Sequence, residues 1–314
     1  MKINIVRYNP EYKKNWDDLV SRSKNGVFLF YRDYMEYHSD RFNDYSLLFF
    51  RDGDGLIALM PANIKDDTLY SHGGLTFGGI ISGYDMKTPI IMEIFGRLIE
   101  YLRKRNIRKL IYKAVPNIYH TIPSEEDLYA LFRYNANLIR RDVSSAIYMP
   151  AKLKFQENRI RTIKKAHKNG IVVKRSYDFK TYMRIVEDVL MERHGMKPVH
   201  TYEEMEMLAG RFPDNIKLFA SYKDDTMLAG VIIYESRNVA HAQYIANSNE
   251  GRKLGALDIV FDDLINNYYK EKRYFDFGIS TEEDGRFLNK GLIEYKEGFA
   301  ARAVAYDFYE VSCF

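Results

Sequence analysis

The sequence predicts a mixed α/β protein built from two copies of one domain, joined near Pro150. Its 314 residues are about twice the usual length of a single domain. Both halves show the same order of elements: helix, helix, three strands, helix, strand, helix, strand. The hairpins at Leu47 and Leu218 begin about 171 residues apart, and the strands at Leu110 and Tyr274 about 164 apart, too far for the repeats of a solenoid.

The first half, residues 1–150, combines alternating strands with amphipathic helices. Asp-Gly between two apolar runs is typical of a hairpin turn. Ser124, three residues before Asp127, predicts a capping box. The expected elements are a strand Ile3–Tyr8, helices Glu11–Ser23 and Arg32–Arg41, a hairpin turning at Asp52–Gly55, an extended glycine-rich segment Leu69–Ile81, a helix Thr88–Asn106, a strand Lys109–Val115, a helix opened by Ser124 and a strand Ser145–Met149.

The second half, residues 151–314, repeats this order. Gly170 is expected to end its first helix, because glycine readily adopts the left-handed conformation of helix ends. The expected elements are a helix Phe155–Asn169, a strand Ile171–Arg175, helices Phe179–His194 and Tyr202–Arg211, strands Lys217–Tyr222, Met227–Glu235 and Val239–Ala246, a helix Leu254–Lys270, a strand Tyr274–Gly278, a helix near Leu292–Gly298 and a strand Ala301–Glu310.

Composition excludes several classes of protein. An apolar fraction of 46% and an aromatic fraction of 15% exclude a disordered chain. The single cysteine, Cys313, excludes an intrachain disulfide and a cysteine-rich zinc site, and the seven histidines show no metal-binding spacing. The opening residues lack a signal peptide, and no apolar run has the length of a membrane span. We therefore expect a cytoplasmic protein without a membrane span or a metal.

The strongest charge feature is a basic run over Arg159–Arg175, with seven Lys or Arg and no Asp or Glu. On a helix, Arg161, Lys164 and Lys165 fall on neighbouring faces, where they can bind a diphosphate or a nucleic-acid backbone. A solvated helix face would explain the same run, and the sequence leaves both interpretations open.

Several segments resemble the tandem GNAT-fold acyltransferases related to the FemAB and FemX aminoacyltransferases. They are NWDDLVSRSKNGVFLFYRDYMEYH and SHGGLTFGGII in the first half, and NRIRTIKKAHKNGIVV, YFDFGIS and GLIEYKEGF in the second. The resemblance covers nearly the whole chain and implies two tandem GNAT-like domains. Residues 1–150 would form the acceptor side and residues 151–314 the donor side of an N-acyltransferase, in which an amine attacks a thioester or an aminoacyl ester.

The resemblance also implies a donor site in the second half. The GNAT pyrophosphate signature is matched by Arg252 and Gly255, but its last small residue is missing. The amides of Gly255 and Ala256 would face the pyrophosphate of acyl-CoA at a helix start. Gln243 or Tyr244 would lie near the acyl carbonyl on a splayed strand. A helix start without a ligand, and core packing of Tyr244, remain open alternatives.

For the chemistry, the resemblance points to the residues around YFDFGIS and GLIEYKEGF. Asp276, or a loop carboxylate such as Glu283, would accept the proton of the amine. Lys296 would stabilise charge on the leaving group or the oxyanion, and Tyr295 would donate a proton to the leaving thiolate. Alternatively, Asp276 orients local backbone, Lys296 is a surface residue and solvent takes the proton. The expected substrate contacts are Arg32, His72, Gly73, Gly74, Thr76, Arg161, Lys164 and Lys165.

Three functions are therefore considered. The first is transfer from acyl-CoA, as cosubstrate, to an amine such as an amino sugar or a precursor of the cell envelope or of a polysaccharide, including a nucleotide-activated one. The second is a FemAB-type aminoacyltransferase that uses aminoacyl-tRNA, and the third is a GNAT-like binding protein without catalysis. The sequence favours the first and does not set the oligomeric state.

Overall fold

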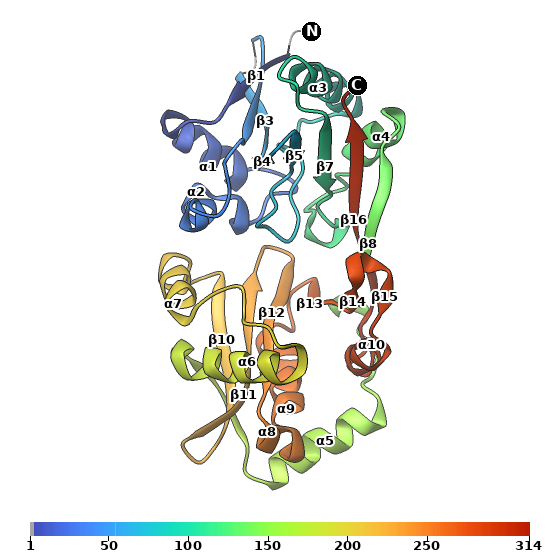
Figure 1. Ribbon diagram of the computed structural model, residues 1–314. Helices are drawn as coiled ribbons and strands as arrows, with labels where there is room; N and C mark the ends of the chain where they lie inside the picture. The colour runs from blue at the N-terminus through green and yellow to red at the C-terminus, as the bar shows by residue number, and fades with distance from the viewer. Residues whose placement is uncertain (1–2, 54) are drawn as a thin grey trace. The chain divides into compact units, whose positions relative to one another are not determined.

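The computed structural model describes residues 3–53 and 55–314, so Asp54 of the expected hairpin turn lies outside the described residues. The chain divides into two compact units. The first contains Met1–Val143, Thr281–Phe287 and Ala305–Phe314, and the second contains Ser144–Ser280 and Leu288–Val304. Two long strands, β8 (Asn137–Tyr148) and β16 (Arg302–Ser312), contribute residues to both units (Figure 1).

The first unit contains one four-stranded antiparallel sheet and a second set of strands in the order β4-β5-β7-β16-β8. Apolar residues of α3 and α4 join residues of both sets of strands in one core. The elements are β1 (Ile3–Arg7), α1 (Lys13–Ser21), α2 (Arg32–Met35), β2 (Leu47–Arg51), β3 (Gly55–Met60), β4 (Asn63–Lys65), β5 (Thr68–Tyr70), β6 (Ile81–Ser82), α3 (Thr88–Arg103), β7 (Lys109–Lys113) and α4 (Glu126–Arg133).

Two predictions for this unit are wrong. The helix expected over Arg32–Arg41 ends at Met35 and continues only as a 3₁₀ turn, Glu36–His38. The capping box at Ser124 does not form: Glu125 is the N-cap residue of α4, without a side-chain cap. Asp127 is instead buried and accepts a hydrogen bond of 2.7 Å from the Tyr112 hydroxyl, so a tertiary contact replaces the local cap.

The second unit contains strands in the order β8-β13-β12-β11-β10-β9, with helices on both faces. Helices α6 and α9 lie on opposite faces of these strands (Figure 1). Apolar residues of α5 and α9 pack in one core with Val231 and Ile233 of β11, while Tyr182 of α6 packs against Gly230. The elements are α5 (Glu157–Lys168), β9 (Val172–Ser176), α6 (Phe179–His194), α7 (Tyr202–Arg211), β10 (Ile216–Lys223), β11 (Thr226–Glu235), β12 (Val239–Asn247), α8 (Asn249–Leu254), α9 (Ala256–Asp263), β13 (Tyr274–Ile279), β14 (Thr281–Glu282), β15 (Phe287–Leu288) and α10 (Lys290–Glu297), of which β14 and Phe287 belong to the first unit.

The helix expected over Leu254–Lys270 is broken in the structure. Helix α8 starts earlier, at Asn249, and ends at Gly255, whose φ of +80° interrupts the helical backbone before α9 begins. A Cβ atom at Gly255 would lie 2.8 Å from the Thr162 carbonyl oxygen of α5. The close packing of α5 against this junction explains both the break and the glycine.

Candidate functional site

Strand β12 carries a β-bulge at Gln243. Ala242 pairs with Ile233 of β11, but the next pair joins Tyr244 to Ile232, so that Gln243 is an extra residue in the ladder. The bulge reverses the alternation of side chains along β12. As a result, His241 and Tyr244 lie on the same face of the strand, opposite the face of Ala242, which packs in the core.

Strands β12 and β13 pair in parallel over only three positions, the last of which joins His241 to Asp276. Beyond this pair, β13 bends at Gly278, which has a φ of +76°, and its register with β8 shifts. In the described residues, the edge of β12 beyond Ala242 therefore has no ladder partner from β13. An open strand edge beside a bulge offers backbone groups to an extended ligand.

Asp276 is fully buried at the last of these paired positions and accepts three hydrogen bonds. The Ser144 hydroxyl and the Gly278 amide donate to its Oδ1 atom, at 2.6 and 3.1 Å. Nδ1 of His241 lies 2.8 Å from its Oδ2 atom. Three donors around one carboxylate stabilise its ionised form. The arrangement is an aspartate–histidine pair in which both oxygens of the buried carboxylate accept hydrogen bonds.

Lys296 of α10 is buried beside this pair, with 3% of the residue exposed. Its ammonium group donates to the carbonyl oxygens of Gly278 and Ile279, at 2.9 and 2.6 Å. Burial lowers the pKa of Lys296 to about 8, although the charge of Asp276 acts in the opposite direction. Lys296 thus holds the bend of β13 and brings a positive charge close to Asp276.

Tyr295, the neighbouring residue on α10, points into a different environment. Its hydroxyl donates to Oδ1 of Asp258 at 2.8 Å, and Arg159 pairs with the other carboxylate oxygen at 3.0 Å. The Arg159 guanidinium also lies 4.7 Å from the centre of the tyrosine ring. Burial raises the pKa of Tyr295 well above its ordinary value. The structure therefore brings Lys296, but not Tyr295, to Asp276. The other expected carboxylate, Glu283, is exposed in a 3₁₀ turn of the first unit.

The residues of the pyrophosphate signature follow β12 directly. Arg252 is partly exposed on α8 and donates to the Asn249 side chain at 2.9 Å. Gly255 and Ala256 are both buried, and Gly255 lies against Thr162 of α5. Gly255 thus permits α5 to pack closely against the junction of α8 and α9. Of the three residues, only Arg252 offers a charge at the surface.

The basic run forms an exposed face of α5. Ile163 and Ala166 face the core, whereas Arg161, Lys164 and Lys165 are exposed. None of these three side chains forms an ion pair with another described residue. The face is therefore free to contact an external anion.

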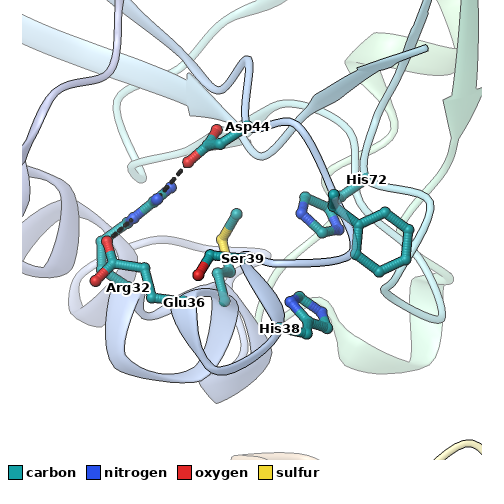
Figure 2. Close-up of a pocket in the computed structure, with 8 residues that line it drawn as sticks. Arg32, Glu36, His38, Ser39, Asp44 and His72 are labelled. Atoms are coloured by element: carbon teal, nitrogen blue, oxygen red, sulfur yellow. Dashed lines mark hydrogen bonds and ion pairs between the residues drawn. The ribbon is translucent and has the colours of Figure 1, made fainter.

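Two of the expected substrate contacts of the first unit, Arg32 and His72, line a small pocket of about 20 Å³, which has space for about one water molecule. Figure 2 shows Arg32 between Glu36 and Asp44 on one side, with His38 and His72 on the other. Arg32 donates to Glu36 at 3.0 Å and also pairs with Asp44. The rings of His38 and His72 stack with their centres 5.4 Å apart. Burial, followed by the proximity of His38, lowers the pKa of His72 to about 3, so His72 is neutral at pH 7.

The glycine-rich loop that follows His72 packs against Phe42, a residue that lines this pocket. The Gly73 amide donates to the Asn63 side chain at 2.6 Å, and the Gly74 amide donates to Nδ1 of His72 at 3.3 Å. A Cβ atom at Gly74 would lie 2.5 Å from the Phe42 ring. Glycine at this position thus lets the loop approach the aromatic wall of the pocket, while Thr76 is exposed further along the loop.

Lys113, which was not predicted from the sequence, binds the backbone of this loop. Its buried ammonium donates to the carbonyl oxygens of His72, at 3.0 Å, and Leu75. Burial lowers the pKa of Lys113 to about 7. In each unit, a buried lysine therefore binds two backbone carbonyls beside the candidate site.

His241 was also not selected as a site residue, although a signal for it exists. His241 and Asp276 are the third residues of the strands VAH and YFD, and equal positions lie side by side when two such strands pair in parallel. Residues 3–53 and 55–314 contain no group of three or more metal-binding side chains, and no helix formed by them is long and apolar enough to cross a membrane.

Residues 153–297 match the family model described as an acetyltransferase (GNAT) domain. None of the curated proteins matches the sequence. Three solved structures share the fold at low sequence identity. FemX has a TM-score of 0.68 and 12% identity, over 98% of this chain and 97% of FemX. L-PGS from Bacillus licheniformis has a TM-score of 0.62 and 12% identity, over 96% and 92%.

The third structure is a tandem GNAT protein from the clavulanic acid biosynthesis pathway, with a TM-score of 0.54 and 10% identity over 100% of this chain and 99% of that protein. These comparisons confirm the predicted α/β fold of two tandem GNAT-like domains and the resemblance to FemAB-related proteins. The family match also confirms the predicted acyltransferase class.

Proposed function

We propose that this chain, which has the tandem GNAT fold and an acetyltransferase (GNAT) domain over residues 153–297, transfers an acyl group from acyl-CoA to an amine. We expect the acceptor to be an amino sugar or another precursor of the cell envelope or of a polysaccharide, including a nucleotide-activated one. The donor would bind to the second unit, and the acceptor pocket would be that of the first.

The bulge at Gln243 is the observation that carries this proposal. A bulged residue turns backbone amides away from the ladder, and such donors can polarise an acyl carbonyl in the transition state. The open edge of β12 next to the bulge can bind the amides of an extended thiol arm in the manner of an added strand. Arg252, on the helix directly after β12, supplies a positive charge for the diphosphate.

The pocket of the first unit suits an amine. Two carboxylates, Glu36 and Asp44, line it against one guanidinium, and the neutral His72 adds no positive charge. Carboxylates attract an ammonium group, and the stacked rings provide an apolar wall beside it. We expect Gly73, Gly74 and Thr76 to contribute the rim on the loop side.

The first test is the melting temperature with and without coenzyme A. A ligand that binds only the native state stabilises it by about 2.7 kcal/mol at a hundredfold excess over its dissociation constant. We expect such a shift in the wild type and its loss in Arg252→Glu. Lys270→Glu is the matched control, because it makes the same charge change at an exposed position further along the chain and should keep the shift.

A panel of amines with acetyl-CoA and longer acyl-CoA donors then tests transfer. Turnover with at least one amine would support the proposal. A protein that binds coenzyme A but transfers no acyl group to any amine would instead be a GNAT-like binding protein without catalysis.

The exposed basic face of α5 favours a second candidate, a FemAB-type transferase that uses aminoacyl-tRNA. Arg161, Lys164 and Lys165 could contact an RNA backbone, and such binding weakens steeply with salt because each contact releases counterions. In this case the wild type would show no shift with coenzyme A, but an affinity for tRNA that falls between 50 and 200 mM salt. Binding that does not change with salt would contradict the second candidate.

A further inference from the structure

His241 and Asp276 lie in contact at the last position where β12 and β13 pair. Asp276 accepts hydrogen bonds from Ser144 and Gly278 through one oxygen and faces Nδ1 of His241 with the other, at 2.8 Å. An ionised carboxylate has no proton to donate, so the proton of this last contact belongs to Nδ1 of His241. The Nε2 atom then carries the lone pair of the neutral imidazole.

The other side of the His241 ring is open to a reactant. The side chain is 12% exposed, and in the described part of the chain no protein group forms a hydrogen bond with Nε2. The nearest ring atom, Cε1, would lie 3.4 Å from a Cβ atom at Gly278. Glycine at the bend therefore leaves this side of the imidazole uncovered, where the Cβ atom of another residue would lie in contact with the ring.

The position of His241 also matches the carbonyl-binding feature. His241 precedes the bulged Gln243 by two residues on β12, and the bulge places Tyr244 on the same face as His241. Asp276, by contrast, is fully buried and already accepts hydrogen bonds at both of its oxygens, so it is shielded from a reactant. The histidine, and not the aspartate, is in a position to exchange a proton with a bound molecule.

We propose that His241 is the general base of the acyl transfer and that Asp276 is a positioning residue that fixes its tautomer. The inference rests on the proposed function. The amine nitrogen attacks the thioester carbonyl, a C–N bond forms, and Nε2 of His241 takes the proton of the nitrogen. The C–S bond then breaks, its electron pair leaves with sulfur, and His241 returns the proton to the thiolate, which yields the amide and the free thiol.

The pH dependence of this step involves the groups around the ring. They are Asp276 on β13, Lys296 on α10, Tyr234 on β11, and Tyr244, whose hydroxyl contacts His200 at 2.6 Å. A general base needs a free lone pair at Nε2, so the acid limb of the pH–rate profile should depend on the His241 side chain. Burial raises the pKa of Tyr244 to about 12, so Tyr244 does not contribute to the acid limb of the profile. The pKa of Lys296 is about 8, and the profile of Lys296→Met identifies its contribution.

Three variants test the inference with the complete chain. His241→Ala removes the base, and Asp276→Asn keeps the shape but presents an amide N–H to Nδ1, which moves the imidazole proton to Nε2. Tyr234→Phe is the matched control, because Tyr234 pairs with His241 across the ladder and its hydroxyl contacts the Met205 sulfur at 3.9 Å. We expect kcat to fall by about 10²–10⁴ in His241→Ala and Asp276→Asn, with KM and the shift with coenzyme A unchanged.

Further readouts separate a catalytic from a structural role. Imidazole added to His241→Ala should restore part of the rate, and the acid limb of the pH profile should disappear in this variant. Two-bond ¹H–¹⁵N spectra should show the proton of His241 on Nδ1 in the wild type and on Nε2 in Asp276→Asn, whether or not a substrate is known.

Transfer by the wild type that persists within about threefold in His241→Ala, with its acid limb intact, would overturn the inference alone. A wild-type proton on Nε2 would overturn it as well. Failure of the wild type to transfer any acyl group would overturn the proposed function and this inference with it.

Discussion

Replacing Lys113 by Met should change how the stability of the first unit depends on pH. Lys113 is buried beneath the glycine-rich loop, with its ammonium on the carbonyl oxygens of His72 and Leu75 and 5.5 Å from the Phe308 ring. Burial lowers its pKa from 10.5 to about 7. Methionine has a similar length and no charge, so the variant removes the titration and leaves the packing nearly intact.

The sign follows from proton binding. Between pH 7 and 10.5 the unfolded chain holds the proton of Lys113 and the folded unit does not, so the free energy of unfolding rises with pH over this range. The wild type should therefore gain about 2 kcal/mol relative to Lys113→Met between pH 7 and pH 9. The variant also lacks two hydrogen bonds, which adds a constant difference in the free energy of unfolding between the two proteins. The effect of the Lys113 titration is the change of this difference with pH.

Urea unfolding followed by tryptophan fluorescence provides the assay. Trp16 is the only tryptophan of the chain and is fully buried in the first unit, so its emission reports on the unit that contains Lys113. Lys109→Met, at an exposed position on the same strand, should show no such pH-dependent difference. If the free-energy difference between wild type and Lys113→Met is the same at pH 7 and pH 9, the lowered pKa and the argument from burial are refuted.

Three further substitutions test the packing around the two sites. Gly255→Ala should lower stability by about 1–3 kcal/mol in thermal or urea unfolding, because a Cβ atom at this left-handed position meets Thr162. Gly291→Ala in α10 should not destabilise, because its Cβ would meet only Asn289 at an ordinary contact distance of 3.9 Å; equal effects would contradict the close packing of α5. Tyr295→Phe should lose about 1–2 kcal/mol from the missing hydrogen bond to Asp258 and keep its turnover number, so a large fall in kcat would restore Tyr295 as the proton donor. Arg32→Met should cost about 1–3 kcal/mol, since it removes the buried cation that pairs with Glu36 and Asp44, and a neutral effect would show that the two carboxylates are solvated without it.

Elements with strong local signals could be predicted from the sequence. The bounds of α6 and α7 agree with the prediction, and α7 opens with a capping box between Thr201 and Glu204, a feature that four consecutive residues encode by themselves. The helix after β12 was predicted less well. Its break at Gly255 depends on α5, which lies about 90 residues earlier in the chain and whose approach no local pattern records.

Of the candidate site, the sequence predicted several residues but not their contacts. The sequence pointed to Asp276 and Lys296 through short segments that resemble related acyltransferases, and to Gln243 through its position on the strand expected to splay. It did not reveal that Lys296 binds the carbonyls of the β13 bend, or that Tyr295 beside it faces Asp258. Neighbours on a helix point in directions about 100° apart, so one of the two can reach a site that the other cannot.

The sequence by itself determined the chemistry available to this protein: the duplicated order of elements, the basic α5, the glycine-rich loop and the set of polar residues on the strands of the second half. Only the tertiary structure decided which of them act together. His241 and Asp276 lie 35 residues apart and meet because β12 and β13 pair in parallel for three positions and then separate. A pairing of this kind depends on the register between strands, and register is set by packing over the whole sheet.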